Sequence, residues 1–248
     1  MNATPSPRPW ETHLDVEGQS ADHYLDYVNE PLLEAIESPP ARVLDLGCST
    51  GALGERLKRI HPGARVTGVE AGRAAAERAA GRLDHVINAR IEDLDFSAPP
   101  LGPGAFDVII AGDVLEHLVN PWKALQQIRA SIAPGGRMIA SIPNVRNLQV
   151  SLDLLLRGRW DYDERGLLDV THLRFFAFDN IRSLFEDTGY VVESSRAMLS
   201  PRLSALYHEY ANKGVVDLRI DRVVISGVTQ RELTEFCTEQ YIVRARPA

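Results

Sequence analysis

Short apolar runs alternate with segments of helical periodicity between residues 43 and 142. The runs have the length of buried strands, and the segments between them repeat apolar residues at the spacing of one helix face. The expected strands are 43–46, 66–69, 85–87, 106–111 and 138–142, and the expected helices are 52–60, 71–83 and 121–132. Because strands that alternate with helices imply right-handed crossovers, the pattern predicts a doubly wound, Rossmann-like α/β fold with a mostly parallel sheet.

The pattern is less regular on either side of this core. Helical spacing before the core, over 22–37, stops at Pro39 and Pro40. The alternation also stops after Pro143, and it resumes with a helix expected at 179–188 and a strand expected at 190–194.

A second irregular section, 196–238, has helical character over 196–212 and strand character over 219–226. A last strand candidate follows at 240–244. We therefore expect a flexible lead-in over 1–21 and a single domain over 22–248, with substrate-side insertions at 144–177 and 196–238. The second insertion either completes a substrate pocket or forms a contact in a homodimer.

Composition narrows the class of protein but identifies no function. The hydrophobic fraction of 44% and the charged fraction of 25% are ordinary for a globular protein. The net charge of −7, without a massed basic run, disfavours nucleic acid and anionic membranes as partners. Cys48 and Cys237 form no C-x-x-C pair, and no run is long and apolar enough to span a membrane. We expect a cytoplasmic protein.

A glycine-rich turn follows the first expected strand and carries the strongest signal for a ligand. Asp45, Gly47 and Gly51 lie where the carboxyl edge of a parallel sheet binds ligands. The spacing is neither the G-x-G-x-x-G of a dinucleotide site nor a P-loop, which argues against a nicotinamide oxidoreductase. Glu70 ends the second strand, where a carboxylate can accept both hydroxyl protons of a ribose. These features favour a ligand with adenosine and no phosphates, although Glu70 alone can be merely solvated and Asp45 can bind turn amides.

Residues 41–195 resemble a class I S-adenosylmethionine-dependent methyltransferase, in the branch that includes the ubiquinone-biosynthesis O-methyltransferases. The run Asp45-Leu-Gly-Cys-Ser-Thr-Gly51, the strand Phe106-Asp-Val-Ile109, the stretch Asp113-Val-Leu-Glu-His117 and the turn Pro134-Gly-Gly136 carry the resemblance, in this order. The resemblance implies S-adenosylmethionine as cofactor. The residues that it places at the cofactor are Tyr24, Asp45, Gly47, Cys48, Ser49, Gly51, Glu70 and Asp113.

One position departs from the family pattern. Ala89-Arg90 stands where the family usually has Gly-Asp, so the usual aspartate contact to the adenine amine is missing. The Ile91 backbone or the Glu92 side chain is the expected substitute. Tyr24 is similar in position to aromatic residues that close over the methionine end of the cofactor, and ordinary packing is the alternative.

Two histidines are candidates for the base that a hydroxyl acceptor requires, since the imidazole pKa lies near neutrality. His172 with Asp169 as its orienting partner is our first choice, and His117 is the second. Either histidine can instead have a structural role. In some relatives the residues corresponding to Asp113, Glu116 and His117 help to bind a divalent cation. We expect no metal here, because neighbours on a helix diverge by about 100°.

The insertion that contains His172 is dense in aromatic and basic residues, as substrate-binding loops often are. Trp160 and Tyr162 are candidates to stack on a ring, and Arg157 and Arg174 to bind phosphate or carboxylate. A lid packed by its aromatic residues, with solvated arginines, is the alternative. The stretch 169–176 resembles one found in bacterial methyltransferases of surface-polysaccharide and other sugar pathways.

These features favour O-methylation of a small polar acceptor such as a sugar or glycan unit. N-methylation of a sugar amine and methylation of a natural product are the alternatives among enzymes. A protein that binds S-adenosylmethionine without transferring its methyl group, with a regulatory role, is the alternative of a different class.

Overall fold

The computed structural model describes residue 14 and residues 26–248. Its main element is a seven-stranded sheet with the order β3-β2-β1-β4-β5-β9-β6. Five neighbouring strands are parallel, and β9 pairs antiparallel with both β5 and β6. The strands are β1 Arg42–Leu46, β2 Arg65–Glu70, β3 His85–Asn88, β4 Phe106–Gly112, β5 Ile132–Pro143, β6 Tyr190–Leu199 and β9 Thr238–Pro247. The prediction of a doubly wound, mostly parallel sheet is confirmed.

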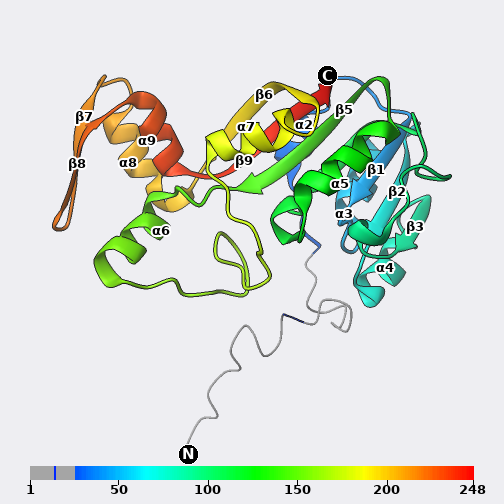
Figure 1. The fold of residues 1–248 in the computed structure, drawn as a ribbon, viewed down its shortest axis with the longest axis horizontal. Helices are drawn as coiled ribbons and strands as arrows, with labels where there is room; N and C mark the ends of the chain where they lie inside the picture. The colour runs from blue at the N-terminus through cyan, green and yellow to red at the C-terminus, as the bar shows by residue number, and fades with distance from the viewer. Residues whose placement is uncertain (1–13, 15–25) are drawn as a thin grey trace, which may run out of the picture.

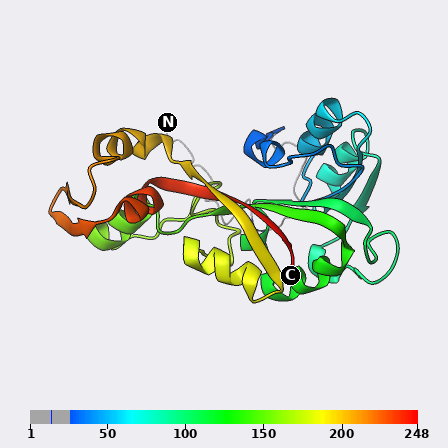
Figure 2. The ribbon, with the colours of Figure 1, turned by 90° about the horizontal axis from the view of Figure 1, so that it is seen from above.

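Helices cover both faces of the sheet and form two separate apolar cores with it (Figure 1). On one face lie α5 (Pro121–Ile128) and α7 (Phe178–Glu186). On the other lie α2 (Glu30–Glu34), α3 (Ala52–Ile60) and α4 (Arg73–Ala79). Figure 2 shows α2, in blue, and α7, in yellow, on opposite sides of the sheet.

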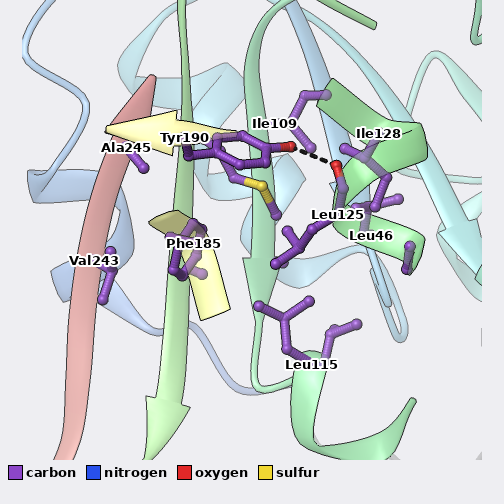
Figure 3. Close-up of a cluster of buried hydrophobic side chains, with 14 of the residues drawn as sticks. Leu46, Ile109, Leu115, Leu125, Ile128, Phe185, Tyr190, Val243 and Ala245 are labelled. Atoms are coloured by element: carbon purple, nitrogen blue, oxygen red, sulfur yellow. Dashed lines mark hydrogen bonds between the residues drawn. The ribbon is translucent and has the colours of Figure 1, made fainter. Parts of the chain in front are cut away.

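The core under α5 and α7 is closed by Tyr190 and Phe185, whose rings meet edge to face at 5.7 Å (Figure 3). The Tyr190 hydroxyl donates a hydrogen bond of 2.9 Å to the carbonyl of Leu125. Because a buried phenol needs such a partner, this bond fixes β6 against α5. The strand β6 therefore has a fixed position at the edge of the sheet.

A smaller group of elements extends beyond the carboxyl end of β5 and has its own apolar cluster, built on Leu148, Leu218 and Leu233 (Figure 1). Its elements are α6 Leu148–Leu152, the π-helical turn Asp153–Arg157, α8 Ser204–Tyr210, the hairpin of β7 Val216–Ile220 and β8 Val223–Val228, and α9 Gln230–Cys237. In the described part of the chain, no helix is long and apolar enough to cross a membrane.

Several expected boundaries are wrong. The stretch 196–212 is not helical throughout, because 196–199 belongs to β6 and only Ser204–Tyr210 is helix. The helix at 71–83 is shorter, because the chain turns at Gly81 toward β3, and the described part of 22–37 is helical only over Glu30–Glu34. The expected helix at 121–132 ends at Ile128, and Ile132 already belongs to β5.

Candidate active site

A cavity of about 470 Å³ opens at the carboxyl ends of β1, β4 and β5. The turn after β1 lines one half of it, and acidic and histidine side chains after β4 and from the loop 165–172 line the other. The described residues that line it come from six separate stretches of the chain. The polar residues among those that line the cavity are Tyr27, Asn29, Asp45, Ser49, Thr50, Asp113, Glu116, His117, Arg165, Asp169, His172, Glu239 and Gln240.

The turn after β1 has a backbone that only particular residues can adopt. Gly47 has φ +66°, and a Cβ there would lie 2.5 Å from Cγ2 of Val114. Ser49 has φ +50°, and its N–H donates a 2.9 Å hydrogen bond to Glu70. A side chain in this left-handed region costs free energy, which the surrounding contacts must offset. The turn is thus held open toward the cavity, and Gly47, Cys48 and Ser49 all line it.

Asp45 contributes a buried carboxyl group to the cavity. It is 2% exposed, it lines the cavity, and its Oδ2 has no hydrogen-bond partner among the described residues. Burial, and then the charge of Glu70, raise the pKa of Asp45 to about 7. A buried carboxylate in this state is costly and fits a site that receives a cationic group, such as the ammonium of an amino acid.

Glu70 lies at the end of β2, directly behind Ser49, and not among the residues that line the cavity. Its two oxygens accept hydrogen bonds from the N–H groups of Ser49, at 2.9 Å, and Gly72, at 2.7 Å. Burial raises its pKa, and these amide bonds oppose the rise. Each carboxylate oxygen keeps a further lone pair, so the position expected for ribose is compatible with this geometry.

The two substitutes expected at the adenine lie outside the cavity lining as well. Ile91 is buried in the core under α5. The Glu92 carboxylate accepts hydrogen bonds from the N–H groups of Val119, at 3.3 Å, and Asn120, at 2.8 Å. The side chain of Glu92 is therefore engaged at the start of α5, so the Ile91 backbone remains the simpler candidate for adenine.

Tyr24, the aromatic residue expected over the cofactor, lies outside the described residues. The segment that follows crosses the turn after β1, where Asp26 accepts a 2.6 Å hydrogen bond from Thr50 and pairs with Arg82 at 2.8 Å. The hydrogen bonds from Arg82 and Thr50 hold the pKa of Asp26 far below its usual range. Tyr27, not foreseen from the sequence, lines the cavity as a result.

The other half of the cavity contains three side chains that can exchange protons. Glu116, in the short turn Leu115–His117, is 1% exposed, and neither of its oxygens has a hydrogen-bond partner among the described residues. Burial raises its pKa well above the usual range. The His117 and His172 rings meet edge to face at 4.7 Å, and His172 Nε2 lies 3.9 Å from Glu116 Oε1. Burial lowers the pKa of His117, and burial together with His117 lowers that of His172 to about 4.

The Asp169 carboxylate, expected to orient His172, is hydrogen-bonded to Thr171 instead. Asp169 accepts hydrogen bonds from the N–H and the hydroxyl of Thr171, at 2.8 and 2.6 Å. The Thr171 hydroxyl lies 3.0 Å from Nδ1 of His117, while Nδ1 of His172 lies 3.2 Å from the carbonyl of Leu167. The carboxylate is therefore connected to His117, because the turn at 169–171 directs it toward Thr171.

Glu116, His117 and His172 have ligand atoms that all lie within 4.8 Å of one another. Such a group has the composition of a divalent-cation site. On a regular helix the neighbouring side chains of Glu116 and His117 would diverge too far to share an ion. They lie in a 3-10 turn instead, and His172 approaches from another segment.

The four residues expected to bind the acceptor are not among those that line the cavity. Arg157 is 71% exposed and pairs with Asp153. Trp160 packs on Phe175 at 5.1 Å, and Tyr162 is exposed. Arg174 donates to the carbonyls of Leu173 and Val119. This arrangement matches the packed lid that was the alternative.

Residues other than the four expected to bind the acceptor line this part of the cavity. Arg165 reaches the cavity from the same insertion, and Glu239 and Gln240 reach it from the start of β9. Arg165 belongs to the run of charged residues that precedes Gly166, so composition could have indicated it. No sequence signal indicates Glu239 or Gln240, because their place depends on the antiparallel pairing of β9 with β5.

The comparisons with known proteins agree with this geometry. A family model described as a methyltransferase domain matches residues 21–195. The ubiquinone biosynthesis O-methyltransferase of Bradyrhizobium diazoefficiens is 30% identical over 75% of this chain and 70% of its own length. The mitochondrial enzyme of the same name from Schizosaccharomyces pombe is 35% identical over 47% of this chain and 43% of its own length.

Among solved structures, a methyltransferase from Thermotoga maritima described as a possible histamine N-methyltransferase has a TM-score of 0.59 and 16% identity, and the alignment covers 92% of each chain. This likeness concerns the fold. The chain spans between 35% and 59% of the length of three of the curated relatives that it matches. By the family match, the identity and the sheet order, the chain belongs to the class I S-adenosylmethionine-dependent methyltransferases.

Proposed function

We propose that the protein transfers a methyl group from S-adenosylmethionine to a hydroxyl oxygen of a small polar acceptor, such as a sugar or glycan unit, and that a cavity histidine removes the hydroxyl proton. One observation carries the proposal. The turn typical of the cofactor and the pair His117 and His172 line a single cavity at the carboxyl edge of the sheet. A cytoplasmic location and a single domain over 22–248 belong to the same proposal.

The cofactor half of the cavity has the groups that S-adenosylmethionine requires. Asp45 offers an unpaired carboxylate oxygen to the ammonium group, and Gly47 and Ser49 offer backbone at close approach. We assign Glu70, directly behind Ser49, to the ribose, and Asp113, which lines the cavity after β4, to the cofactor side as expected from the sequence. When bound, the cofactor supplies an electrophilic methyl group on a sulfonium sulfur.

The residues of the other half align the acceptor and take its proton. Methyl transfer is an in-line displacement, so positioning and removal of one proton are the main tasks of the protein. Burial lowers the pKa of both His117 and His172, so both rings are neutral near pH 7 and each retains one lone pair. A neutral imidazole is the form that accepts a proton. We propose that catalysis needs no metal, although the group around Glu116 has a suitable composition.

The charge of the cavity supports an acceptor without an anionic group near the reacting atom. The described residues that line the cavity include the carboxyl groups of Asp113, Asp169 and Glu239 and one guanidinium, that of Arg165. A phosphate or carboxylate there would face several like charges. A sugar hydroxyl fits best, and an amine is the second candidate, because the same acidic side chains also favour a cation.

A transfer assay with deuterated methyl donor tests the proposal. The purified protein is incubated with S-adenosylmethionine and neutral glycosides, amino sugars, sugar phosphates and phenols, and both S-adenosylhomocysteine and labelled product are measured by mass spectrometry. We expect product with a glycoside. Replacement of the histidine that acts as the base, among His117 and His172, should lower the rate of methyl transfer by about 10²-fold or more. His208→Gln, in α8 and outside the cavity lining, is the matched control.

If product forms only with amino sugars, the methyl group is accepted by an amine nitrogen and not by a hydroxyl oxygen. Product only with sugar phosphates would contradict the argument from charge. Tight cofactor binding without S-adenosylhomocysteine from any acceptor would support the regulatory alternative instead.

A further inference from the structure

A chain of hydrogen bonds connects Asp169 with His117 through Thr171. Oδ1 of Asp169 accepts from the Thr171 hydroxyl at 2.6 Å and from the Thr171 N–H at 2.8 Å. The same hydroxyl oxygen lies 3.0 Å from Nδ1 of His117, and the Thr171 carbonyl lies 3.3 Å from that nitrogen. The hydroxyl is thus the nearer partner of the imidazole, and its bond to a carboxylate polarises it.

Counting protons along this chain determines the tautomer of His117. A carboxylate oxygen can only accept, so the single proton of the Thr171 hydroxyl points to Asp169. The hydroxyl oxygen is then left as an acceptor, and Nδ1 of His117 must carry the hydrogen. In a neutral ring the lone pair is therefore on Nε2. The Thr171 hydroxyl, held by Asp169, therefore fixes both the orientation and the tautomer of the His117 ring.

The second histidine has a different environment. Nδ1 of His172 faces the carbonyl of Leu167, so its lone pair is also on Nε2. That nitrogen lies 3.9 Å from Oε1 of Glu116, which is buried without another hydrogen-bond partner in the described part of the chain. The lone pair of His172 thus faces a carboxyl group. Of the two histidines, His117 is the one connected to a carboxylate through its Nδ1.

We propose that Thr171 is a positioning residue, which holds His117 in the Nδ1–H tautomer so that Nε2 of His117 takes the proton of the acceptor hydroxyl. This inference rests on the proposed function. The O–H bond of the acceptor breaks and its proton goes to Nε2, while an oxygen lone pair forms the new O–C bond and the electron pair of the broken C–S bond stays on sulfur. The imidazolium that results is stabilised by Asp169 through the hydroxyl, as in other triads with an orienting carboxylate.

The charged and titratable groups around His117 come from two segments. Asp113 and Glu116 follow β4, and Asp169 and His172 belong to the loop 165–172. Among them, only Asp169 has a hydrogen-bonded connection to Nδ1 of His117 in the described residues. A change at Thr171 therefore acts on His117 without removing any of these charges.

Nuclear magnetic resonance of the full chain labelled with ¹⁵N-histidine tests the tautomer directly and requires no acceptor. Long-range ¹H–¹⁵N correlations distinguish a protonated Nδ1 from a protonated Nε2, and the signals of His117 are those lost in His117→Gln. We expect the Nδ1–H form of His117 in the wild type and in Thr171→Ser, which keeps the hydroxyl. In Thr171→Val, which keeps the shape but not the hydroxyl, the Thr171 carbonyl at 3.3 Å is the remaining acceptor, so we expect the Nδ1–H form to lose part of its excess to the Nε2–H form.

Asp169→Ala provides a second test should the valine variant fold poorly, because it frees the Thr171 proton to be donated to Nδ1 and shifts the tautomer in the same direction. His172 is the internal reference, since its Nδ1 bonds to Leu167. The proposal is overturned if His117 is in the Nε2–H form in the wild type, or if removal of the hydroxyl leaves its tautomer unchanged. Either result is independent of whether methyl transfer is detected, so failure of the proposed function is recognised separately.

Discussion

Asp45→Asn should stabilise the ligand-free protein at neutral and alkaline pH while weakening the binding of the cofactor. Burial raises the pKa of Asp45 from 3.8 to about 7, so the folded protein holds a proton that the unfolded chain releases. Stability that depends on this proton is present below the unfolded pKa and is lost as the pH rises from about 4 to about 7. The loss is about 4 kcal/mol, because a tenfold change in an equilibrium constant corresponds to about 1.4 kcal/mol.

The amide of the variant cannot ionise, so this pH-dependent loss should disappear. A buried amide without partners costs about 1–3 kcal/mol, which leaves a net gain of about 1–3 kcal/mol for Asp45→Asn above pH 7. Urea unfolding at about pH 5 and about pH 8 measures the effect, and the wild type should lose about 2–3 kcal/mol more than the variant between these two conditions. Comparing the two proteins at both pH values cancels the contributions of titrating groups that do not interact with Asp45, whereas Glu70 is coupled to it.

Cofactor affinity provides the second half of this test. Because the ammonium group of the cofactor requires an ionised carboxylate, the affinity of the wild type should rise with pH up to about 7 and that of Asp45→Asn should be lower and flat. Identical pH dependence of stability in the two proteins would refute the assignment of the perturbed carboxyl group to Asp45. Unchanged cofactor affinity would refute its role as the partner of the ammonium group.

Three further substitutions test separate parts of the account. Gly47→Ala should lower the free energy of unfolding by about 2 kcal/mol or more, because φ is +66° and the new Cβ would meet Val114; unchanged urea unfolding would contradict this. Arg157→Ala should leave the KM for the acceptor within about twofold, since the side chain is exposed and outside the cavity lining; a larger rise would return Arg157 to the acceptor site. Tyr190→Phe should cost about 1 kcal/mol in thermal unfolding through the lost bond to Leu125, and equal stability would show that bond to be immaterial.

Much of the central sheet could be predicted from the sequence because local periodicity specifies it. The helix 52–60 has the predicted bounds, and the strands β1 to β4 differ from the predicted ones by one residue at an end at most. The turn from Asp45 to Gly51 was recognisable for a physical reason, since Gly47 and Gly51 adopt positive φ and a Cβ at Gly47 would clash with Val114.

The parts of the cavity that the sequence did not predict depend on contacts between segments that are distant in the chain. The strand β9 lies between β5 and β6 and brings Glu239 to the cavity, and no local sequence pattern predicts this strand order. Likewise, Thr171 and His117 are 54 positions apart, so their hydrogen bond was not visible from the sequence. The helix α9 was missed, because the sequence analysis left 230–237 in an irregular section, although Thr229 and Glu232 form a capping box at its start.

Calorimetric titration with S-adenosylmethionine and S-adenosylhomocysteine tests directly whether the cavity at the end of β1 binds the cofactor. The comparison is between the wild type, Glu70→Gln and the control Glu77→Gln, whose carboxylate is exposed in α4. We expect saturable binding by the wild type and affinity lower by about tenfold or more in Glu70→Gln, as for the loss of a hydrogen bond to a charged group, and we expect no change in the control. Absence of binding in the wild type, or equal affinity in all three proteins, would contradict this expectation.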